Sequence, residues 1–353
     1  MDPASASPPA SRSPETLITL AHGSGGKAMA DLIETVFAAR FNHPALVVLG
    51  DQAVVALPPG LAVGDRLALT TDSYVVDPLF FPGGDIGTLA VNGTVNDLAV
   101  GGALPLYLTC GFILEEGLPV ATLERVVDSM AAAATAAGVA IVAGDTKVVP
   151  RGSADQLFIN TAGVGLVPAG LHLSPQAMAP GDVILVNGPL GDHGAAITVA
   201  RADLALESPI QSDCQALHGL AQAMLAACPQ LRTMRDATRG GLATVLNEWV
   251  VASPVGIRLQ QADLPVRPAV QGLCEILGFD PLYLANEGRL VAVVPAAAAE
   301  AVLAAMRSHP AGIDSQRIGE VIADPPGRVL INTGFGGDRI LDRLVGDQLP
   351  RIC

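Results

Sequence analysis

The chain has 353 residues, which is enough for two domains of ordinary size, and 50% of them are hydrophobic. Its formal net charge of −14 argues against general binding to nucleic acid or to anionic membranes, because both require clustered Lys and Arg. No uninterrupted apolar run approaches the ~18 residues that suggest a membrane span. With 38 Gly and 27 Pro, the composition is typical of a well-packed α/β or α+β protein with many tight turns.

The five cysteines are scattered along the chain and lack the CxxC spacing of a metal site. They indicate neither a disulfide framework nor a zinc signature, so we expect a reducing cytoplasm as the compartment. Apolar neighbours predict that the internal cysteines pack in the core. These internal residues are Cys110, Cys214, Cys228 and Cys274. The fifth cysteine, Cys353, is the last residue.

Residues 1–16 are expected to form a disordered extension. They are rich in Ser, Pro and Ala and lack the basic start and apolar segment of a signal peptide. A Gly-rich loop at 22–27 then leads into a predicted helix at 28–41. The loop only superficially resembles a phosphate-binding P-loop, because its Gly spacing is short and Ala28 stands where Ser or Thr should bind Mg²⁺. A flexible lid over a ligand is the favoured interpretation.

A first domain is predicted over residues 17–168. Apolar runs predict strands at 46–49, 66–71, 106–114, 139–143 and 157–167. Helical periodicity predicts helices at 85–100 and 120–137.

A second domain is predicted over residues 169–332, and it begins with a connector at 171–182. Strands are expected at 183–186, 256–259, 290–294, 318–322 and 329–331. Helices are expected near 212–227, 240–251, 268–277 and 296–308. Together the two domains predict an α+β fold. Residues 333–353 are predicted to be a flexible tail with a short helix at 338–345.

Acidic side chains follow the predicted strands of the first domain. Asp51, Asp72 and Asp145 each come after a strand, and Asp97 lies on the helix at 85–100. Strand ends of one sheet tend to meet at one edge, so we expect these carboxylates to gather there around a cation. Mg²⁺ prefers such oxygen ligands and usually bridges them to substrate phosphates. For any single Asp, a turn or a helix cap is the ordinary alternative, whereas the set favours a metal–nucleotide site.

Three further residues are candidates for the same site. Lys147 lies in an otherwise apolar segment, where its charge should face a ligand or an acid, although a solvated lysine is the common alternative. Glu287 precedes the strand at 290–294, where it either pairs with Arg289 or acts as a general base. His22 lies in the Gly-rich loop and is a candidate for the nucleotide site, with a structural role as the alternative.

The chain closes with Leu-Pro-Arg-Ile-Cys at 349–353. A thiol on a mobile terminus can enter a pocket and carry a group there, and a stray terminal residue is the alternative. Prenylation is disfavoured, because nothing follows Cys353. Conformational freedom that would let the tail swing out and in is provided by Gly334, Gly336, Gly337 and Gly346.

Taken together, these strings resemble the HypE family of hydrogenase expression/formation proteins, within the superfamily of aminoimidazole ribonucleotide synthetase and selenophosphate synthetase. The resemblance covers residues 17–353, and the closing Pro-Arg-Ile-Cys is its most specific part, since superfamily relatives lack it. It is carried by the segments 22–26, 70–74, 92–99, 143–149, 191–194, 236–242, 286–289 and 350–353.

The resemblance implies an aminoimidazole ribonucleotide synthetase-like architecture that forms a homodimer through its ATP-binding first domain. It implies a carbamoyl dehydratase that works on its own C-terminal thiol. A partner carbamoyltransferase, HypF, would place a carbamoyl group on Cys353, and this protein would use ATP to dehydrate the S-carboxamide to an S-cyanate. The cyano group would then pass to iron on a HypC–HypD complex and supply the cyanide ligands of NiFe hydrogenase.

The expected mechanism makes Cys353 the substrate carrier, Lys147 the cation that stabilises developing charge, and Glu287 the base that removes a proton from nitrogen. ATP would be bound by His22, Asp51, Asp72, Asn96, Asp97, Asp145 and Lys147. Mg²⁺ would be bound by Asp51, Asp72, Asp97 and Asp145.

Two other interpretations stay open. One is another ATP-dependent small-molecule phosphotransferase of the superfamily, such as a selenophosphate synthetase or a thiamine-phosphate kinase. A selenophosphate synthetase is expected to carry a reactive Cys or selenocysteine in the Gly-rich loop, and the loop at 23–26 has none. The other is a non-catalytic maturation scaffold with a docking tail, against which the acids and Lys147 argue.

Overall fold

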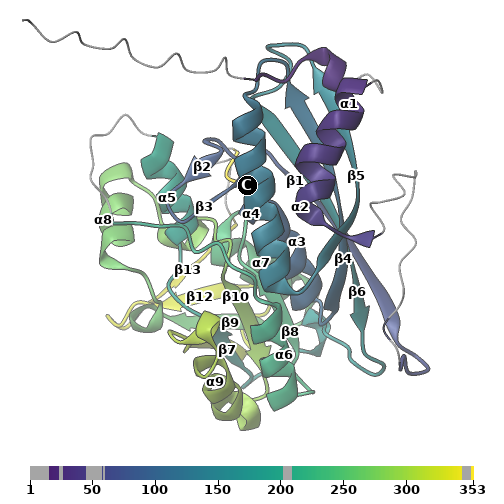
Figure 1. Cartoon of the computed structure of the whole chain (residues 1–353). Coiled ribbons are helices and arrows are strands. Elements are labelled where there is room, and N and C mark those ends of the chain that lie inside the picture. Colours follow the sequence, from purple (N-terminus) through teal and green to yellow (C-terminus); the bar gives the residue numbers. More distant parts are fainter. Residues whose placement is uncertain (1–15, 24–26, 45–57, 59, 202–208, 344–350) are drawn as a thin grey trace, which may run out of the picture.

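The computed structural model describes residues 16–23, 27–44, 58, 60–201, 209–343 and 351–353 (Figure 1). These residues form a four-stranded sheet, a seven-stranded sheet and a two-stranded ribbon, with helices packed between and around them. The predicted α+β class is therefore confirmed. The predicted strand at 46–49, Asp51 and residues 344–350 of the tail lie outside the described residues. None of the described helices is both long enough and apolar enough to cross a membrane.

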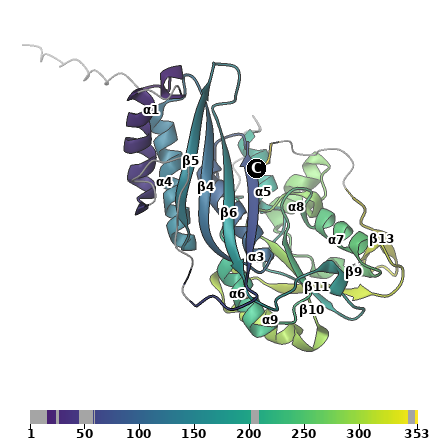
Figure 2. The ribbon, with the colours of Figure 1, turned by 90° about the vertical axis from the view of Figure 1, so that its right-hand side faces the viewer.

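The four-stranded sheet has the order β1-β6-β4-β5, and its long strands stand side by side in Figure 2. Its elements are β1 (Arg66–Tyr74), β4 (Leu104–Glu115), β5 (Ala140–Val149) and β6 (Leu157–Val167), with the helices α3 (Ile86–Val100) and α4 (Val120–Ala137). Alternate residues of β4, such as Leu108 and Phe112, are buried in a core shared with both helices. Residues between them point to the other face, where Leu69 of β1 is 76% exposed and Ile113 of β4 is 44% exposed.

The seven-stranded sheet has the order β13-β12-β9-β11-β7-β10-β8. Its strands are β7 (Val183–Val186), β8 (Thr233–Asp236), β9 (Gly256–Gln260), β10 (Leu290–Val294), β11 (Gln316–Ile322), β12 (Val329–Asn332) and β13 (Asp338–Ile340). One face packs against α7 (Gly241–Ala252), and the other packs against α6 (His218–Ala227) and α9 (Ala299–Arg307). Because both faces are covered, β10 is buried throughout, as its continuous apolar run predicts.

Helix α3 joins the two halves. Its flank packs on β1, β4 and β6, while its C-terminal residues Ala99 and Val100 enter the core around α6 and α9. The helix begins at Asp85, whose Oδ1 accepts hydrogen bonds from the backbone N–H groups of Gly87 (2.7 Å) and Thr88 (2.9 Å). Ser129 of α4 donates to the same oxygen (2.8 Å), so one carboxylate fixes the start of α3 and its position on α4.

Several predicted elements need correction. β1 runs on to Tyr74 and β5 to Val149, so Asp72 and Asp145 lie inside strands rather than after them. The helix predicted at 338–345 is wrong, because Asp338–Ile340 forms β13 and pairs with β12. The turn between these strands holds Gly334 and Gly336 at φ values of 76° and 87°, and this hairpin geometry overrides the weak helical pattern. β8 was not predicted, because it has four residues and little apolar alternation.

We predict that Asp85→Ala lowers the free energy of unfolding by about 1–2 kcal/mol, because three donors lose their shared acceptor. Urea denaturation measures this loss. Asp85→Asn keeps an acceptor oxygen and serves as the matched control, with a smaller loss expected. Equal stability of Asp85→Ala and the wild type would contradict the assigned cap.

Candidate active site

The end of the chain lies inside the molecule. In both ribbon views the C-terminus sits between the four-stranded sheet and α5 (Asp192–Arg201) (Figures 1 and 2). Ile352 and Cys353 are buried, with exposed fractions of 4% and 5%. The backbone N–H of Val75, just past β1, donates to an oxygen of the Cys353 terminal carboxylate (2.9 Å). The terminal thiol is therefore buried where the end of β1 meets α5, and the side chains around it are here called the Cys353 pocket.

The pocket around Cys353 is acidic. Burial is the main reason that the pKa of the Cys353 thiol is raised far above its usual value, and the Glu287 carboxylate is the next. Asp72 and Asp236 act in the same direction, while the Arg239 guanidinium opposes them. Because the thiol stays protonated near neutral pH in this position, Cys353 is poorly suited to attack a substrate here. It is better suited to carry a group that has already been attached.

Glu287 is the acid at the centre of this pocket. Its side chain is buried, and its Oε1 has no hydrogen-bond partner among the described residues. Its backbone N–H donates to Asp213 Oδ1 (3.1 Å), and its carbonyl oxygen accepts from the Asn96 side-chain amide (3.3 Å). Burial raises the pKa of Glu287 well above its ordinary value, with repulsion from Asp213 and Asp236 adding to the effect. A carboxyl group in this state binds a proton more strongly than an ordinary Glu, which suits a general acid or base.

A second acid, Asp97, faces the same region from α3. Thr70 of β1 donates its hydroxyl to Asp97 Oδ2 (2.9 Å). Burial, followed by repulsion from Asp236 and assisted by Asp72, raises the pKa of Asp97 to about 7. Asp72 of β1, Asp97 of α3 and Asp236 at the end of β8 therefore lie close enough that their negative charges repel one another. A bound cation would reduce this repulsion.

These acids fit a magnesium ion that is completed by a nucleotide. Within the described parts of the chain, no group of three His, Cys, Asp or Glu side chains is arranged to hold a metal ion. Mg²⁺ commonly takes one or two protein carboxylates and fills its other positions with water and phosphate oxygens. Asp72 and Asp97 supply carboxylates of this kind, whereas Asp51 lies outside the described residues.

The expected meeting of all the acids at one sheet edge is wrong for Asp145 within one chain. β1 and β5 are the two opposite edge strands of the sheet, so two strands separate Asp72 from Asp145. Along β1, Thr70, Asp72 and Tyr74 alternate with more exposed residues and face α3. On β5 it is Thr146 that is buried, so Asp145 points to the opposite face.

Lys147 lies beside Asp145 on that exposed face. Its Nζ is 2.5 Å from Asp145 Oδ2, and both side chains are more than 60% exposed. This ion pair lowers the pKa of Asp145. Lys147 thus pairs with a neighbour on an exposed face, as a solvated lysine would, and the pair does not join the Cys353 pocket of the same chain.

Two other predicted nucleotide residues have partners of their own. His22 Nδ1 accepts from the Thr19 backbone N–H (3.0 Å), and the one-turn helix that carries His22 contacts the edge strand β5. Asn96 is buried on α3, where its amide donates to the carbonyl oxygens of Gln215 (3.0 Å) and Glu287 (3.3 Å). Its side-chain oxygen accepts from the Leu217 backbone N–H (2.7 Å). Asn96 therefore bridges α3 to the segments that carry Glu287, and a nucleotide contact through its amide would break one of these bonds.

Sequence reasoning missed four residues of this site, namely Asp213, Asp236, Arg239 and His193. A signal existed for three of them, because the strings at 191–194 and 236–242 carried the family resemblance without any assigned role. Asp213 had no such signal. It lies in a segment predicted as helix, yet α6 begins only at His218, and the extended residues before it line the site.

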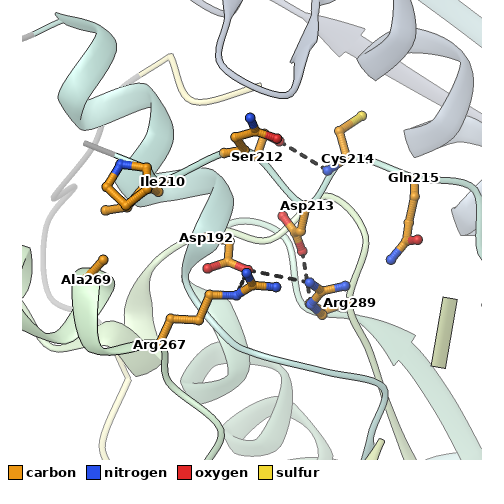
Figure 3. A pocket seen from close by; sticks show the side chains of 11 residues that line it. Asp192, Ile210, Ser212, Asp213, Cys214, Gln215, Arg267, Ala269 and Arg289 are labelled. Carbon is orange, nitrogen blue, oxygen red and sulfur yellow. Dashed lines mark hydrogen bonds and ion pairs between the residues drawn. The ribbon is translucent and has the colours of Figure 1, made fainter. Parts of the chain in front are cut away.

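A cavity of about 400 Å³ lies behind this extended segment, on the α5 side (Figure 3). In Figure 3, Arg267 and Arg289 converge on Asp192, with N–O distances of 3.2 and 3.5 Å, and Arg289 also pairs with Asp213 (3.5 Å). Burial raises the pKa of Asp192 to about 6. The charged side chains that line this cavity thus form ion pairs with one another. The pair between Arg289 and Asp213 holds the segment 212–215 in place.

The chain matches two family models over most of its length. Residues 49–167 match the AIR synthase related protein N-terminal domain, and residues 179–332 match the corresponding C-terminal domain. Carbamoyl dehydratase HypE of Rhodobacter capsulatus is 57% identical over 336 residues, which cover 95% of this chain and 98% of that protein.

Two solved structures are also similar. The hydrogenase maturation protein HypE in complex with ATP is 47% identical, covers 95% of this chain and 99% of its own, and superposes with a TM-score of 0.89. A HypE–HypF complex contains a chain that is 48% identical, covers 89% of this chain and 99% of its own, and gives a TM-score of 0.77.

We predict that Asp97→Asn is more stable than the wild type at pH 8. An acid whose pKa is raised by folding stabilises the native state while it is protonated, and this contribution is lost as the pH rises toward about 7. The variant keeps an acceptor for Thr70 without the charge, so its advantage should be about 1–3 kcal/mol at pH 8 and should shrink toward pH 5.

Thermal unfolding at several pH values measures this difference. Millimolar Mg²⁺ at pH 8 should stabilise the wild type more than the variant and narrow the gap. A wild type that is the more stable protein at pH 8 without Mg²⁺ would contradict the repulsion assigned to the three carboxylates.

Proposed function

Since the chain belongs to the AIR synthase related family and, within it, to the HypE proteins, we propose that it is an ATP-dependent carbamoyl dehydratase acting on its own Cys353. The observation that carries the proposal is the position of Cys353. A C-terminal thiol buried against Glu287 is expected for a substrate carrier docked at a general base, and it has no purpose in a scaffold that only displays its tail.

The proposed reaction converts an S-carboxamide on Cys353 to an S-cyanate. The carboxamide oxygen attacks the γ-phosphorus of ATP and ADP leaves, which turns a poor leaving group into phosphate. Nitrogen loses both of its protons, the C–O bond breaks, and phosphate departs with the oxygen. The products are the S-cyanate, ADP, phosphate and one released proton, so the water equivalent is accounted for by the hydrolysis of ATP.

Glu287 is the proposed base for the nitrogen protons. Its Oε1 is free of hydrogen bonds within the described chain, so it can accept a proton without first breaking a contact. Its raised pKa makes the carboxylate a stronger base than an ordinary Glu. Asp213 and Asn96 hold the Glu287 backbone and thereby set the position of the side chain.

For the nucleotide we propose Asp72 and Asp97 as magnesium ligands, with the ion neutralising charge on the triphosphate. The raised pKa of Asp97 agrees with this proposal, because burial and neighbouring carboxylates leave its negative charge uncompensated until a cation binds. The intrachain cation that acts on Cys353 is Arg239, which takes the place originally expected for Lys147.

A homodimer would bring Asp145 and Lys147 of a second copy to the site. The outer face of the first sheet exposes Leu67 (58%), Leu69 (76%) and Ile113 (44%), an apolar surface that a second copy would cover. If two such faces pack about a twofold axis that runs along the strands, β5 of each protomer lies across from β1 of the other. Each site would then draw on the acids of one chain and on the Lys147 side of its partner.

HypF is the proposed carbamoyl donor, since a relative has been solved as a HypE–HypF complex. A HypC–HypD complex is the proposed acceptor of the cyano group for the iron of NiFe hydrogenase. All five cysteines are free, which agrees with the proposed cytoplasmic location.

We predict that carbamoylated protein loses one water from its C-terminal peptide only when Mg²⁺ and ATP are present. The protein is loaded with HypF, carbamoyl phosphate and ATP, freed of nucleotide, and then followed by mass spectrometry in a single turnover. Glu287→Gln should load normally but dehydrate about 10²–10⁴-fold more slowly. The wild-type rate should rise with pH up to the elevated pKa of Glu287.

Cys353→Ala is the control for the site of loading. An adduct of equal amount on Cys353→Ala, or a normal dehydration rate in Glu287→Gln, would overturn the corresponding assignment. A carbamoylated wild type that keeps its full mass with Mg²⁺ and ATP would overturn the proposed function.

We predict that Leu69→Glu converts the dimer to a monomer, because two charges would have to be desolvated in the apolar interface. Sedimentation velocity measures the change. Val251→Glu is the matched control, since Val251 is 69% exposed on α7, away from the outer face of the first sheet, and should leave the assembly unchanged. A wild-type monomer would remove the proposed route by which Lys147 reaches the site.

A further inference from the structure

Each of the last three residues has a main-chain oxygen that accepts a hydrogen bond. Arg201, the last residue of α5, donates to the Arg351 carbonyl oxygen, and His193, near the start of α5, contacts the Ile352 carbonyl oxygen through Nε2 (2.8 Å). The Val75 N–H donates to an oxygen of the Cys353 terminal carboxylate (2.9 Å). Two donors come from the second half of the molecule and one from the first, so the tail is held from both sides.

We propose that Val75, Asp155, His193 and Arg201 form a recognition site for the C-terminal tripeptide, here called the tail clamp, in which His193 is the residue that positions Cys353 against Glu287. The clamp's role in catalysis rests on the proposed function. Its role in docking the tail stands on the contacts alone.

His193 has only one arrangement that satisfies its neighbours. A carbonyl oxygen can only accept, so Nε2 must carry the proton toward Ile352. Complete burial lowers the pKa of His193, so the ring is neutral and Nδ1 accepts from the Ser212 hydroxyl (2.8 Å). The Ser212 oxygen in turn accepts from the Cys214 backbone N–H (3.1 Å). The edge-on Phe81 ring, 5.5 Å away, leaves the imidazole little freedom to rotate.

This hydrogen-bond chain links the tail to the base. Ser212 and Cys214 flank Asp213, whose carboxylate accepts the backbone N–H groups of Glu287 (3.1 Å) and Gly288 (3.2 Å). A side chain at Gly288 would collide with the Asp213 carbonyl oxygen, so only Gly permits this approach. The segment 212–214 therefore fixes both the position of the Ile352 carbonyl group and the position of Glu287. A shift of His193 would change their separation, which is the geometry that proton transfer depends on.

Arg351 supplies the sequence-specific part of the recognition. Its Nη1 donates to Asp155 Oδ2 (2.6 Å), and its Nε donates to the Val75 carbonyl oxygen (2.9 Å). Its φ of 55° is in the left-handed region, which turns the chain inward at a conformational cost that these contacts offset. Arg201 also donates to the Asp77 carbonyl oxygen (2.5 Å), which ties the second half of the clamp to the segment after β1.

None of these contacts involves the Cys353 sulfur. The clamp contacts main-chain oxygens of the tail and the Arg351 side chain, so it should bind the tail equally well with a free or a carbamoylated Cys353. The polar atom left for the carried group is Glu287 Oε1, which has no partner in the described structure. The clamp thus separates recognition of the tail from chemistry at its end.

The test measures docking through the reactivity of Cys353. Native protein is treated with iodoacetamide at pH 8, and alkylation of each cysteine is followed by peptide mass spectrometry. His193→Ala should raise the Cys353 rate at least about tenfold, because the docked thiol is buried. His193→Gln keeps an N–H donor and should restore part of the protection. His172→Ala, on an exposed residue of the connector, is the matched control and should behave as the wild type.

The buried Cys110, Cys228 and Cys274 report on the rest of the fold in the same sample and should not react faster. Arg351→Ala is a second variant that cannot unfold the core, since it alters only the tail, and it should also expose Cys353. Wild-type reactivity of Cys353 in either His193→Ala or Arg351→Ala would overturn the clamp.

The catalytic role is tested separately by the mass of the C-terminal peptide after loading. His193→Ala should be carbamoylated at least as fast as the wild type, because its Cys353 is more exposed, but dehydrated at least about tenfold more slowly. Normal dehydration in this variant would overturn the positioning role. Failure of the wild type to dehydrate would overturn the proposed function, while the alkylation result would still decide whether the clamp exists.

Discussion

The structure depends on keeping one carboxyl group, that of Glu287, out of water and without a partner at Oε1. A buried polar atom without a hydrogen bond costs about 1–3 kcal/mol, and a buried charge costs more. Other acids add to this cost, because repulsion from Asp213 and Asp236 raises the pKa of Glu287 further. Such a group persists only where the rest of the fold is stable enough to hold it, and it is then available for proton transfer.

Helix α3 provides much of that stability. It is fixed at its start by Asp85, packs along three strands of the first sheet, and ends in the core of the second half. Its Asn96 uses its amide group and its oxygen to hold Glu287 and the neighbouring segment at 215–217. The same helix carries Asp97, so both the base and the proposed magnesium ligand are connected to one rigid element. Their relative position therefore depends on the packing of α3 together with the contacts that Asp213 makes to the Glu287 backbone.

Much of this could be predicted from the sequence, and the failures have physical reasons. The helix at 120–137 and the strand at 290–294 were predicted with the same first and last residues that the structure shows. In both, the local sequence pattern agrees with the burial of the side chains. Asp72 and Asp145 were expected together because both follow apolar runs, but a run does not reveal strand order or which face a side chain takes. The strand order places them on opposite edges, and pleating places them on opposite faces. Asp213 was missed because its contribution depends on contacts with Glu287 and Arg289, more than 70 residues away.

In the proposed reaction, the burial of Cys353 places loading and dehydration in different positions of the tail. Docked, the thiol is buried and its pKa is raised, so it cannot serve as the nucleophile that accepts a carbamoyl group. The tail must therefore leave the pocket to be loaded, and its contacts must be weak enough to break. The three hydrogen bonds to main-chain oxygens of the tail contribute on the order of 1 kcal/mol each, and the half-exposed Arg351–Asp155 pair adds less than about 1 kcal/mol. Because the tail is tethered, contacts of this size suffice to dock it by effective concentration, yet they allow release on the timescale of turnover.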